Sequence, residues 1–411
     1  MSALPEDLKY VIVRFCDISG RVRMFTIAKE LYDQLITEGI DVDGSSVAMT
    51  GIEESDIVVK GDPDTLRLTS LNGGKAVIVT AEVVDPAGID PRIRLKENLE
   101  ELKRRLGMDF RVGAEVEFFL LKDGRPYDSA GYFHAFDDML ELRIKFAEEL
   151  RKLGLQPEVM HHEVAPGQNE INFRYDSAVR TADNILTYKT AIKKVAADLG
   201  LRATFMPKPF EGMNGSGMHL HLSLFKDGEN MFFSGENGKL SELALNFLAG
   251  VLTHAKALAF FASPTVNSYR RLVPGFEAPV YIAWGHRNRS ALVRVPVANG
   301  SSSHRIEYRA PDPSSNPYLL LSAVLAAGLD GIEKKLDPGE PYEGNLYHAR
   351  DSVDMLPGSL EEAMNYALKD EVLIKAVGEK IFERYVEIKK KEILESRLHV
   401  SDWERSFYLD V

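Results

Sequence analysis

The sequence predicts an α+β fold whose sheet is largely antiparallel. Amphipathic helical segments and short β-branched segments are mixed along the chain, without the regular strand–helix–strand alternation that builds a parallel sheet. The chain has 411 residues, of which 45% are hydrophobic and 27% charged. This composition is that of an ordinary globular protein of about two or three domains. We expect no membrane helix, because no segment reaches the roughly 18–20 uninterrupted apolar residues that one needs.

Net charge indicates which binding partners are disfavoured, and cysteine content indicates which cellular compartment to expect. The formal net charge of −12 argues against nucleic acid or an anionic membrane as the main partner. Cys16 is the one cysteine, so no intrachain disulfide can form, and residues 1–9 contain no apolar signal-peptide core. We therefore expect a cytoplasmic protein in which Cys16 is a small core residue.

The first part of the chain is predicted to form a small α+β domain. Its predicted elements are strands at residues 10–15 and 22–27, a helix at 28–38 and a strand at 77–84. Gly39 is a helix-ending residue, and a turn-rich sequence follows the last strand at residues 85–88. We therefore divide the chain into a domain of residues 1–90 and a larger one of residues 91–411.

The larger domain is predicted to be rich in helices. Apolar residues recur at helical spacing in most of these segments, and several of the segments end at a glycine. The main elements are a strand at residues 111–121 and helices at residues 95–106, 137–153, 181–199, 241–261, 317–330 and 371–397.

The strand that follows the first of these helices carries two carboxylates on one face. Side chains alternate along a strand, so Glu115 and Glu117 share a face and their apolar neighbours take the other. A solvated sheet face would explain this pattern. The surrounding sequence is very apolar, however, and adjacent carboxylates that are buried need a cation.

A second pair of glutamates flanks the turn dipeptide Pro166-Gly167. If this dipeptide closes a two-residue hairpin, Glu163 lies directly opposite Glu170. Like charges in such a pair repel unless a cation lies between them. An exposed hairpin tip is the alternative interpretation.

The segment of residues 218–224 alternates without a break. His219, His221 and Ser223 share its polar face, and two histidines on one strand face favour a ligand role over a structural one. The glycine-rich loop before it, residues 212–217, would let backbone amides approach a ligand closely.

Arginines gather near the last polar strand. Arg305, Glu307 and Arg309 lie on one face of that strand, and the segment before it, residues 287–294, is rich in arginine. Guanidinium groups bind phosphate and carboxylate oxygens in a fork geometry. A charged edge strand beside a solvated loop would also explain this pattern.

Five glutamates and one histidine could together hold two divalent cations, and oxygen-rich ligation favours Mg²⁺ or Mn²⁺ over Zn²⁺. Two cations among arginines suit phosphoryl transfer. The sequence contains no Walker A, protein-kinase or G-x-G-x-x-G motif. The residues alone therefore predict a two-metal phosphoryl-transfer enzyme without a standard nucleotide-binding motif.

The same segments resemble, in order and over nearly the whole chain, the type I glutamine synthetases of bacteria and archaea. The matching segments are residues 43–46, 52–56, 115–117, 162–168, 203–209, 214–219, 271–279, 287–290, 309–313 and 316–318. The resemblance implies a β-grasp-like N-terminal domain, and a catalytic domain with a curved sheet flanked by helices. It also implies ATP-dependent joining of ammonium to the γ-carboxylate of glutamate.

Roles for individual residues follow from the resemblance. It implies that one metal is held by Glu117, Glu163 and Glu170, and the other by Glu115, His219 and Glu307. It implies that glutamate is bound by Asn214, Gly215, Arg271 and Arg309, and ATP by His221, Ser223, Phe225, Arg294 and Arg305. Its implied catalytic residues are Asp43, which binds ammonium, Glu277, which covers the intermediate, and Arg289, which handles phosphate.

The resemblance further implies a homo-oligomer, a dodecamer of two hexameric rings, in which Asp43 completes the active site of the neighbouring subunit. Two departures from the family pattern lie near the expected ammonium pocket. Gly51 occupies the place of a regulatory arginine, and residues 134–137 lack the family's proline-containing loop.

Three functions are therefore weighed. The first is glutamate–ammonia ligase. The second is a γ-glutamyl ligase for a larger amine, such as methylamine or a polyamine. The third is a non-catalytic relative. Retention of Asp43 and Glu277 favours the first over the second, and six intact metal-ligand positions argue against the third.

Overall fold

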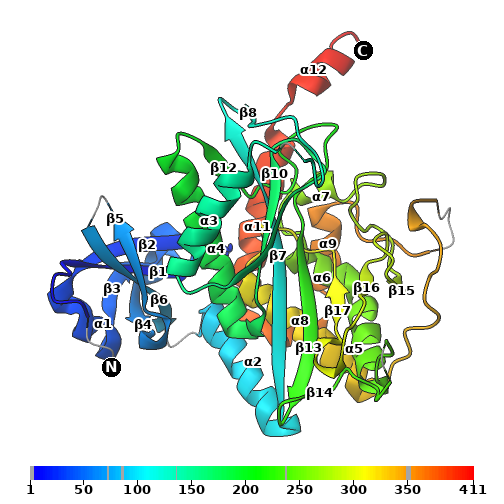
Figure 1. Ribbon diagram of the computed structural model, residues 1–411, viewed down its shortest axis with the longest axis horizontal. Coiled ribbons are helices and arrows are strands. Elements are labelled where there is room, and N and C mark those ends of the chain that lie inside the picture. The colour runs from blue at the N-terminus through cyan, green and yellow to red at the C-terminus, as the bar shows by residue number, and fades with distance from the viewer. Residues whose placement is uncertain (1–3, 72–73, 85–87, 136, 237, 349–352) are drawn as a thin grey trace.

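The computed structural model describes residues 4–71, 74–84, 88–135, 137–236, 238–348 and 353–411. Two sheets and a set of helices make up this part of the chain (Figure 1). The arrangement confirms the predicted α+β class. The proposed domain boundary at residues 85–88 falls largely outside the described residues, as does Phe136 in the departure at 134–137.

The smaller sheet belongs to the N-terminal domain and has the order β2-β1-β6-β4-β3, with β5 paired to β6. Its strands are β1 Tyr10–Cys16, β2 Val22–Ala28, β3 Ile40–Asp43, β4 Asp56–Gly61, β5 Arg67–Leu71 and β6 Gly74–Val84. The pair β1–β6 is parallel, and the other pairs are antiparallel. The three predicted strands are confirmed. The predicted helix at 28–38 is shorter, because a 3₁₀ turn, Lys29–Leu31, precedes α1 Tyr32–Thr37.

The larger sheet has the order β15-β16-β17-β13-β7-β10-β9, with β8, β11 and β12 paired to β7 and β14 paired to β13. The strands are β7 Met108–Lys122, β8 Arg125–Pro126, β9 Pro157–His162, β10 Gln168–Phe173, β11 Asp176–Ser177, β12 Arg202–Thr204, β13 Met218–Lys226, β14 Glu229–Asn230, β15 Trp284–His286, β16 Val293–Val295 and β17 Ile306–Tyr308. Among them β15–β16 is the parallel pair. The prediction of a largely antiparallel sheet is therefore confirmed.

Helices cover this sheet and fill the remainder of the larger domain. They are α2 Pro91–Leu106, α3 Leu140–Lys152, α4 Ala178–Asp198, α5 Glu242–Thr253, α6 Ala255–Ala262, α7 Ser268–Arg271, α8 Pro317–Lys334, α9 Leu360–Ala367, α10 Glu371–Val377, α11 Glu379–Leu398 and α12 Asp402–Tyr408. No single helix in the described residues is long and apolar enough to cross a membrane. The bent pair α5–α6, at 76°, meets the length and composition criteria when its two members are taken together.

Two helices that the sequence predicts as continuous are broken. The predicted helix at 241–261 becomes α5 and α6, which meet at His254. The predicted helix at 371–397 becomes α10 and α11, which meet at Gly378. Gly378 has a φ of +89°, a conformation that side-chain-bearing residues rarely adopt. Hydrophobic periodicity continues across both breaks, and for this reason it did not reveal them.

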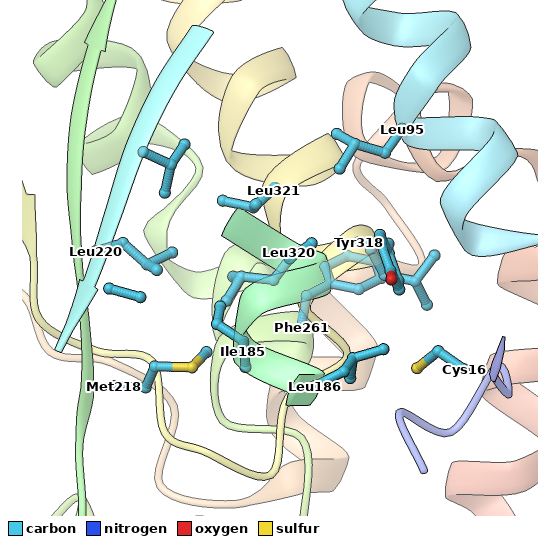
Figure 2. Packing of buried hydrophobic residues seen from close by; sticks show 14 of the residues in the cluster. Cys16, Leu95, Ile185, Leu186, Met218, Leu220, Phe261, Tyr318, Leu320 and Leu321 are labelled. Atoms are coloured by element: carbon cyan, nitrogen blue, oxygen red, sulfur yellow. The ribbon is translucent and has the colours of Figure 1, made fainter. Parts of the chain in front are cut away.

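The core lies between the larger sheet and α4 and α8. Figure 2 shows Met218 and Leu220 of β13 facing Ile185 of α4 and Leu320 of α8, and these side chains are fully buried. Because side chains alternate along a strand, burying the even-numbered positions of β13 directs its histidines to the opposite face. Packing of the core therefore fixes which face of the sheet carries the polar residues.

Candidate active site

Strand register brings the first set of predicted ligands together. His219 of β13 lies directly opposite Glu115 of β7, and its neighbour His221 lies opposite Glu307 of β17. Ligand atoms of Glu115, His219 and Glu307 lie within 4.8 Å of one another. Three strands that are distant in sequence thus supply one cluster, which we call the histidine cluster.

Cationic and imidazole groups neutralise the histidine cluster. Glu307 has no exposed surface, and its carboxylate accepts hydrogen bonds from Arg294 and, at 2.5 Å, from Nη1 of Arg309. Glu115 contacts Nε2 of His221 at 2.8 Å and Nδ1 of His219 at 3.2 Å. Burial raises the pKa of Glu307, but Arg309 and the two histidines outweigh this effect and hold it at about 2. Burial together with Arg309 lowers the pKa of His219 to about 4.

A second cluster, the glutamate cluster, lies on the same face nearer β9. Glu170 of β10 lies directly opposite Glu117 of β7. His161 of β9 contacts Oε1 of Glu163 through Nδ1 and Oε1 of Glu170 through Nε2, both at 3.3 Å. Ligand atoms of His161, Glu163 and Glu170 lie within 4.8 Å of one another. Glu117 accepts hydrogen bonds at Oε2 from Gly217 N, 2.8 Å, and Gln168 Nε2, 2.9 Å.

The predicted register of the hairpin between β9 and β10 is wrong. Glu170 pairs with His161 rather than Glu163, and Glu163 N donates to the Gln168 carbonyl at 2.8 Å. Pro166 has a fixed negative φ and cannot form the primed turns that align hairpin strands. The ladder is therefore shifted by two residues. A shift of two keeps every side chain on its original face, so Glu163 still reaches the cluster.

The glutamate cluster has too little positive charge for its carboxylates. Burial first, and then the neighbouring carboxylates, raise the pKa of Glu163 to about 9. Burial is also the main reason that the pKa of Glu117 is raised to about 7 and that of Glu170 well above its usual value. Such crowding of buried carboxylates is relieved by a divalent cation, and oxygen ligands suit hard cations. The donor set therefore fits a metal.

Both clusters open into one cavity of about 300 Å³. Arg271 lies behind it and is buried, with Nη1 donating to the Ala310 carbonyl at 2.8 Å. Asn214 at the rim donates to Oε2 of Glu277 at 2.8 Å. Among the predicted residues, the cavity is also lined by Glu115, Glu117, Glu163, Glu170, Gly215, His219, Arg289, Arg294 and Arg309.

The loop before β13 requires a residue without a side chain at Gly215. A Cβ atom there would lie 2.3 Å from the Pro207 carbonyl oxygen. The close approach leaves the Gly215 carbonyl within 3.1 Å of Gln168 Nε2, beside Glu117. The close backbone approach expected of this loop is thus made to Pro207 and Gln168, and its approach to a ligand stays a prediction.

A second cavity of about 300 Å³ shares Glu115 with the first. His221, Ser223 and Arg305 line it, and Arg305 Nε donates to Nδ1 of His221 at 3.1 Å. Phe225 does not line this cavity. It lies two residues farther along β13 and faces a separate hollow.

Asp43 lies apart from the cavity. It is exposed at the end of β3, where its carboxylate accepts hydrogen bonds from the hydroxyls of Ser46, 2.5 Å, and Ser45, 2.7 Å. These hydroxyls lower the pKa of Asp43 to about 2, so it is ionised at neutral pH. Within one described chain, this residue does not reach the clusters.

Sequence reasoning missed several residues of the site. His161 and Glu163 are two residues apart, so an extended segment directs both side chains to the same face. The sequence did contain this signal. Tyr132 and Phe133 also line the cavity and pack edge-on against His161. These two aromatic residues carried no pattern from which their position could be predicted.

Comparison with known proteins decides the family. The family model for the glutamine synthetase catalytic domain matches residues 88–408, and the one for the glutamine synthetase β-grasp domain matches residues 7–86. The chain belongs to the glutamine synthetase family. The β-grasp character expected of the N-terminal domain is thereby confirmed.

Relatives in this family match the chain over its full length. Glutamine synthetase of Pyrococcus woesei is 46% identical, covering 100% of this chain and 99% of its own. That of Thermococcus kodakarensis is 45% identical, covering 98% and 96%. The solved structure of a GmaS/ADP complex has a TM-score of 0.91 at 32% identity, covering 99% and 98%. The Plasmodium falciparum glutamine synthetase has a TM-score of 0.87 at 25% identity, covering 98% and 96%.

Proposed function

We propose that this protein joins ammonia to the γ-carboxylate of L-glutamate at the expense of ATP, giving glutamine, ADP and phosphate. The observation that carries the proposal is the strand register, which aligns Glu115 with His219 and Glu117 with Glu170 along one polar face. Full-length identity of about 45% to glutamine synthetases supports it. The larger-amine alternative receives no support from these relatives.

Divalent cations, Mg²⁺ or Mn²⁺, are part of the proposal. Glu115, His219 and Glu307 would hold one, and Glu117, Glu163 and Glu170 the other. When bound, such cations offset the negative charge of the carboxylate and phosphate groups that react. The mixed oxygen and imidazole donors of the histidine cluster suit Mn²⁺ as well as Mg²⁺.

The substrates are assigned to the two connected cavities. We place glutamate against Arg271 and Arg309, with Asn214 and Gly215 beside it, because two buried guanidinium groups suit carboxylates. We place ATP in the second cavity. Its proposed contacts there are His221, Ser223 and Arg305. Arg294, which lines the first cavity, is proposed to meet the phosphates where the two cavities adjoin at Glu115. The expected contact with Phe225 would need ATP to extend into the separate hollow that this residue lines.

The proposed reaction has two steps. The γ-carboxylate of glutamate attacks the γ-phosphorus of ATP, which gives γ-glutamyl phosphate and releases ADP. Arg289 at the cavity rim stabilises the transferred phosphoryl group. Asp43 of a neighbouring subunit then accepts a proton from ammonium, and the resulting ammonia displaces phosphate. Glu277 covers the acyl phosphate and excludes water.

Oligomerisation is needed for this mechanism, because Asp43 does not reach the cavity of its own chain. We propose the dodecamer of two hexameric rings. Helix α12 supports assembly with other copies, since it projects from the remainder of the chain (Figure 1). Its side chains Trp403, Phe407 and Tyr408 are 58%, 65% and 50% exposed, and an apolar set of this kind marks an interaction surface.

The division into domains 1–90 and 91–411 also remains a proposal, supported by family matches that change at residues 86–88. We further place the protein in the cytoplasm, because the one cysteine, Cys16, is a buried free thiol and suits a reducing compartment.

Glutamate-dependent release of ADP tests the function. We expect ammonium to give the highest kcat/KM among ammonium, methylamine and polyamines, with Mg²⁺ or Mn²⁺ present. An amine with a higher kcat/KM than ammonium would establish the larger-amine ligase instead. No ADP release with any acceptor would establish a non-catalytic relative.

A further inference from the structure

A large cavity lies in the seam between the two domains, and none of the residues assigned above lines it. Its volume is about 670 Å³. One wall is the turn between β1 and β2 with the start of β2, residues 19–24. The other walls include α4, the segment of residues 204–206 and the middle of α11. We call it the seam cavity.

The walls of the seam cavity are held together by direct contacts. Asn316 Nδ2 donates to the Asp17 carbonyl at 3.1 Å. Arg14 of β1 donates to Oγ1 of Thr187 of α4 at 2.6 Å. A Cβ atom at Gly20 would lie 3.0 Å from Asn316 N, so the turn is packed closely against the larger domain. The cavity is therefore part of a built interface.

Cations dominate its lining. Two of them are neutralised, because Arg23 pairs with Asp17 and Lys389 with Glu392. The side chains of Lys189, Lys193 and Arg21 also line the cavity. Within the described ranges, none of these three has a carboxylate partner.

Lys189 is the most informative of the three. It is only 9% exposed, and no hydrogen-bond acceptor for its amine is found among the residues that the structure describes. Burial lowers its pKa to about 8. Its stem is held in the wall, and its amine is among the groups that line the cavity, where an anion could pair with it.

Part of the lining is apolar and separates the charged groups. Val22 and Met24 of β2 line it together with Phe205 and Ile388. A single simple ion would leave much of this surface without contacts. An organic molecule with charged ends would fit both parts of the lining.

We propose that the seam cavity binds a small organic anion with at least two negative charges, carried by phosphate or carboxylate groups. Lys189, Lys193 and Arg21 supply its countercharge. Because these residues come from both domains, the ligand joins the N-terminal domain to α4. The site is separate from the proposed active site and does not depend on the assignment of its function.

Calorimetric titration of the full chain tests the proposal, with glucose 6-phosphate, inorganic phosphate and succinate as separate probes. We expect at least one probe to bind, with glucose 6-phosphate and succinate distinguishing phosphate from carboxylate recognition. Lys189→Met keeps the apolar stem and removes the charge, and we expect it to weaken that binding at least tenfold. Lys194→Met is the matched control, because Lys194 lies on the same helix and pairs with Asp198. It should bind as the unmodified protein does.

A second measurement needs no variant. Reductive methylation followed by peptide mass spectrometry reports the reactivity of each lysine in the unmodified protein. We expect the binding probe to slow modification of Lys189 severalfold and to leave Lys194 unchanged. Equal rates at Lys189 with and without every probe, or probe binding that Lys189→Met does not change, would overturn the proposal.

Discussion

The two ligand clusters differ in the charge that surrounds them. Arg294, Arg309 and two histidines surround Glu115 and Glu307, so those carboxylates stay ionised without a metal. The carboxylates of the glutamate cluster have raised pKa values instead. The histidine cluster is thus electrostatically preorganised, whereas the glutamate cluster must lose protons before it can hold a cation.

Glu307→Ala should abolish turnover, with kcat/KM falling at least about 100-fold. The substitution removes a proposed metal ligand and leaves the guanidinium groups of Arg294 and Arg309 unpaired. ADP release and Mn²⁺ binding by electron paramagnetic resonance should both fall. Glu340→Ala, at an exposed position, is the control. Near-normal turnover in Glu307→Ala would contradict the metal assignment.

Metal affinity should weaken as the pH falls. The pKa values of about 7 for Glu117 and about 9 for Glu163 mean that binding a cation near pH 7 releases protons. Affinity should therefore fall by up to about tenfold per pH unit for each proton released. Calorimetric titration with Mn²⁺ in two buffers of different ionisation enthalpy measures the number of protons released when the metal binds.

Glu163→Gln provides the matched comparison for this experiment, because it removes one titrating group and keeps the shape of the side chain. It should release fewer protons than the unmodified protein and show a shallower dependence of affinity on pH. Proton release that is the same in both proteins would show that Glu163 is already ionised before the metal binds.

At the scale of elements, breaks and turns decide where side chains lie. The break between α5 and α6 places His254 between two carboxylates. Its Nδ1 lies 2.6 Å from Oδ2 of Asp370, the residue that precedes α10, and its Nε2 lies 3.1 Å from Oδ2 of Asp330 of α8. Three helical segments are thus joined at one imidazole. The break at Gly378, which has a φ of +89°, similarly separates α10 from α11.

His254 should stabilise the fold more at low pH than at high pH. Burial lowers its pKa, but the hydrogen bonds to Asp370 and Asp330 outweigh that effect and raise it above 6.5. The stabilisation is then fully present below pH 6.5 and is lost as the pH rises through the raised value. Urea unfolding of His254→Gln should show a loss of about 1–2 kcal/mol at pH 6.

The same comparison at pH 9 should give a smaller difference between His254→Gln and the unmodified protein. His286→Gln, at an exposed histidine, is the control and should change little at either pH. A loss that is equal at both pH values would mean that His254 acts through packing or neutral hydrogen bonds rather than through its charge.

At the scale of the whole molecule, two features indicate that one chain is incomplete. Asp43 lies outside the cavity that its proposed role requires, and α12 extends away from the domain with its aromatic side chains exposed. Both features are explained if neighbouring copies supply the missing contacts.

Deleting residues 400–411 should leave the domain folded and weaken assembly. Few buried side chains are lost, because no residue of α12 is buried. Light scattering after size-exclusion chromatography should show smaller oligomers, and activity should fall at low protein concentration. Trp403→Ala with Phe407→Ala should act in the same direction. An unchanged oligomer in both proteins would remove α12 from the interface.

Much of the fold and the site followed from local sequence patterns. Alternation along β7 and β13 correctly placed Glu115, Glu117, His219 and His221 on one face, because the direction of a side chain from a strand depends only on its position in the strand. Most of the strand and helix segments were also predicted, because each type of element has its own spacing of apolar residues. The order of the strands in each sheet could not be obtained this way.

Tertiary structure alone decided the features that depend on long-range contacts. The break at His254 and the seam cavity around Lys189 involve segments far apart in the chain, whereas the two-residue shift that pairs Glu170 with His161 comes from the turn at Pro166. Periodicity describes each element separately, whereas register, breaks and cavities depend on how separate elements pack together. The sequence by itself thus determined which groups face the site, and packing determined which of them meet.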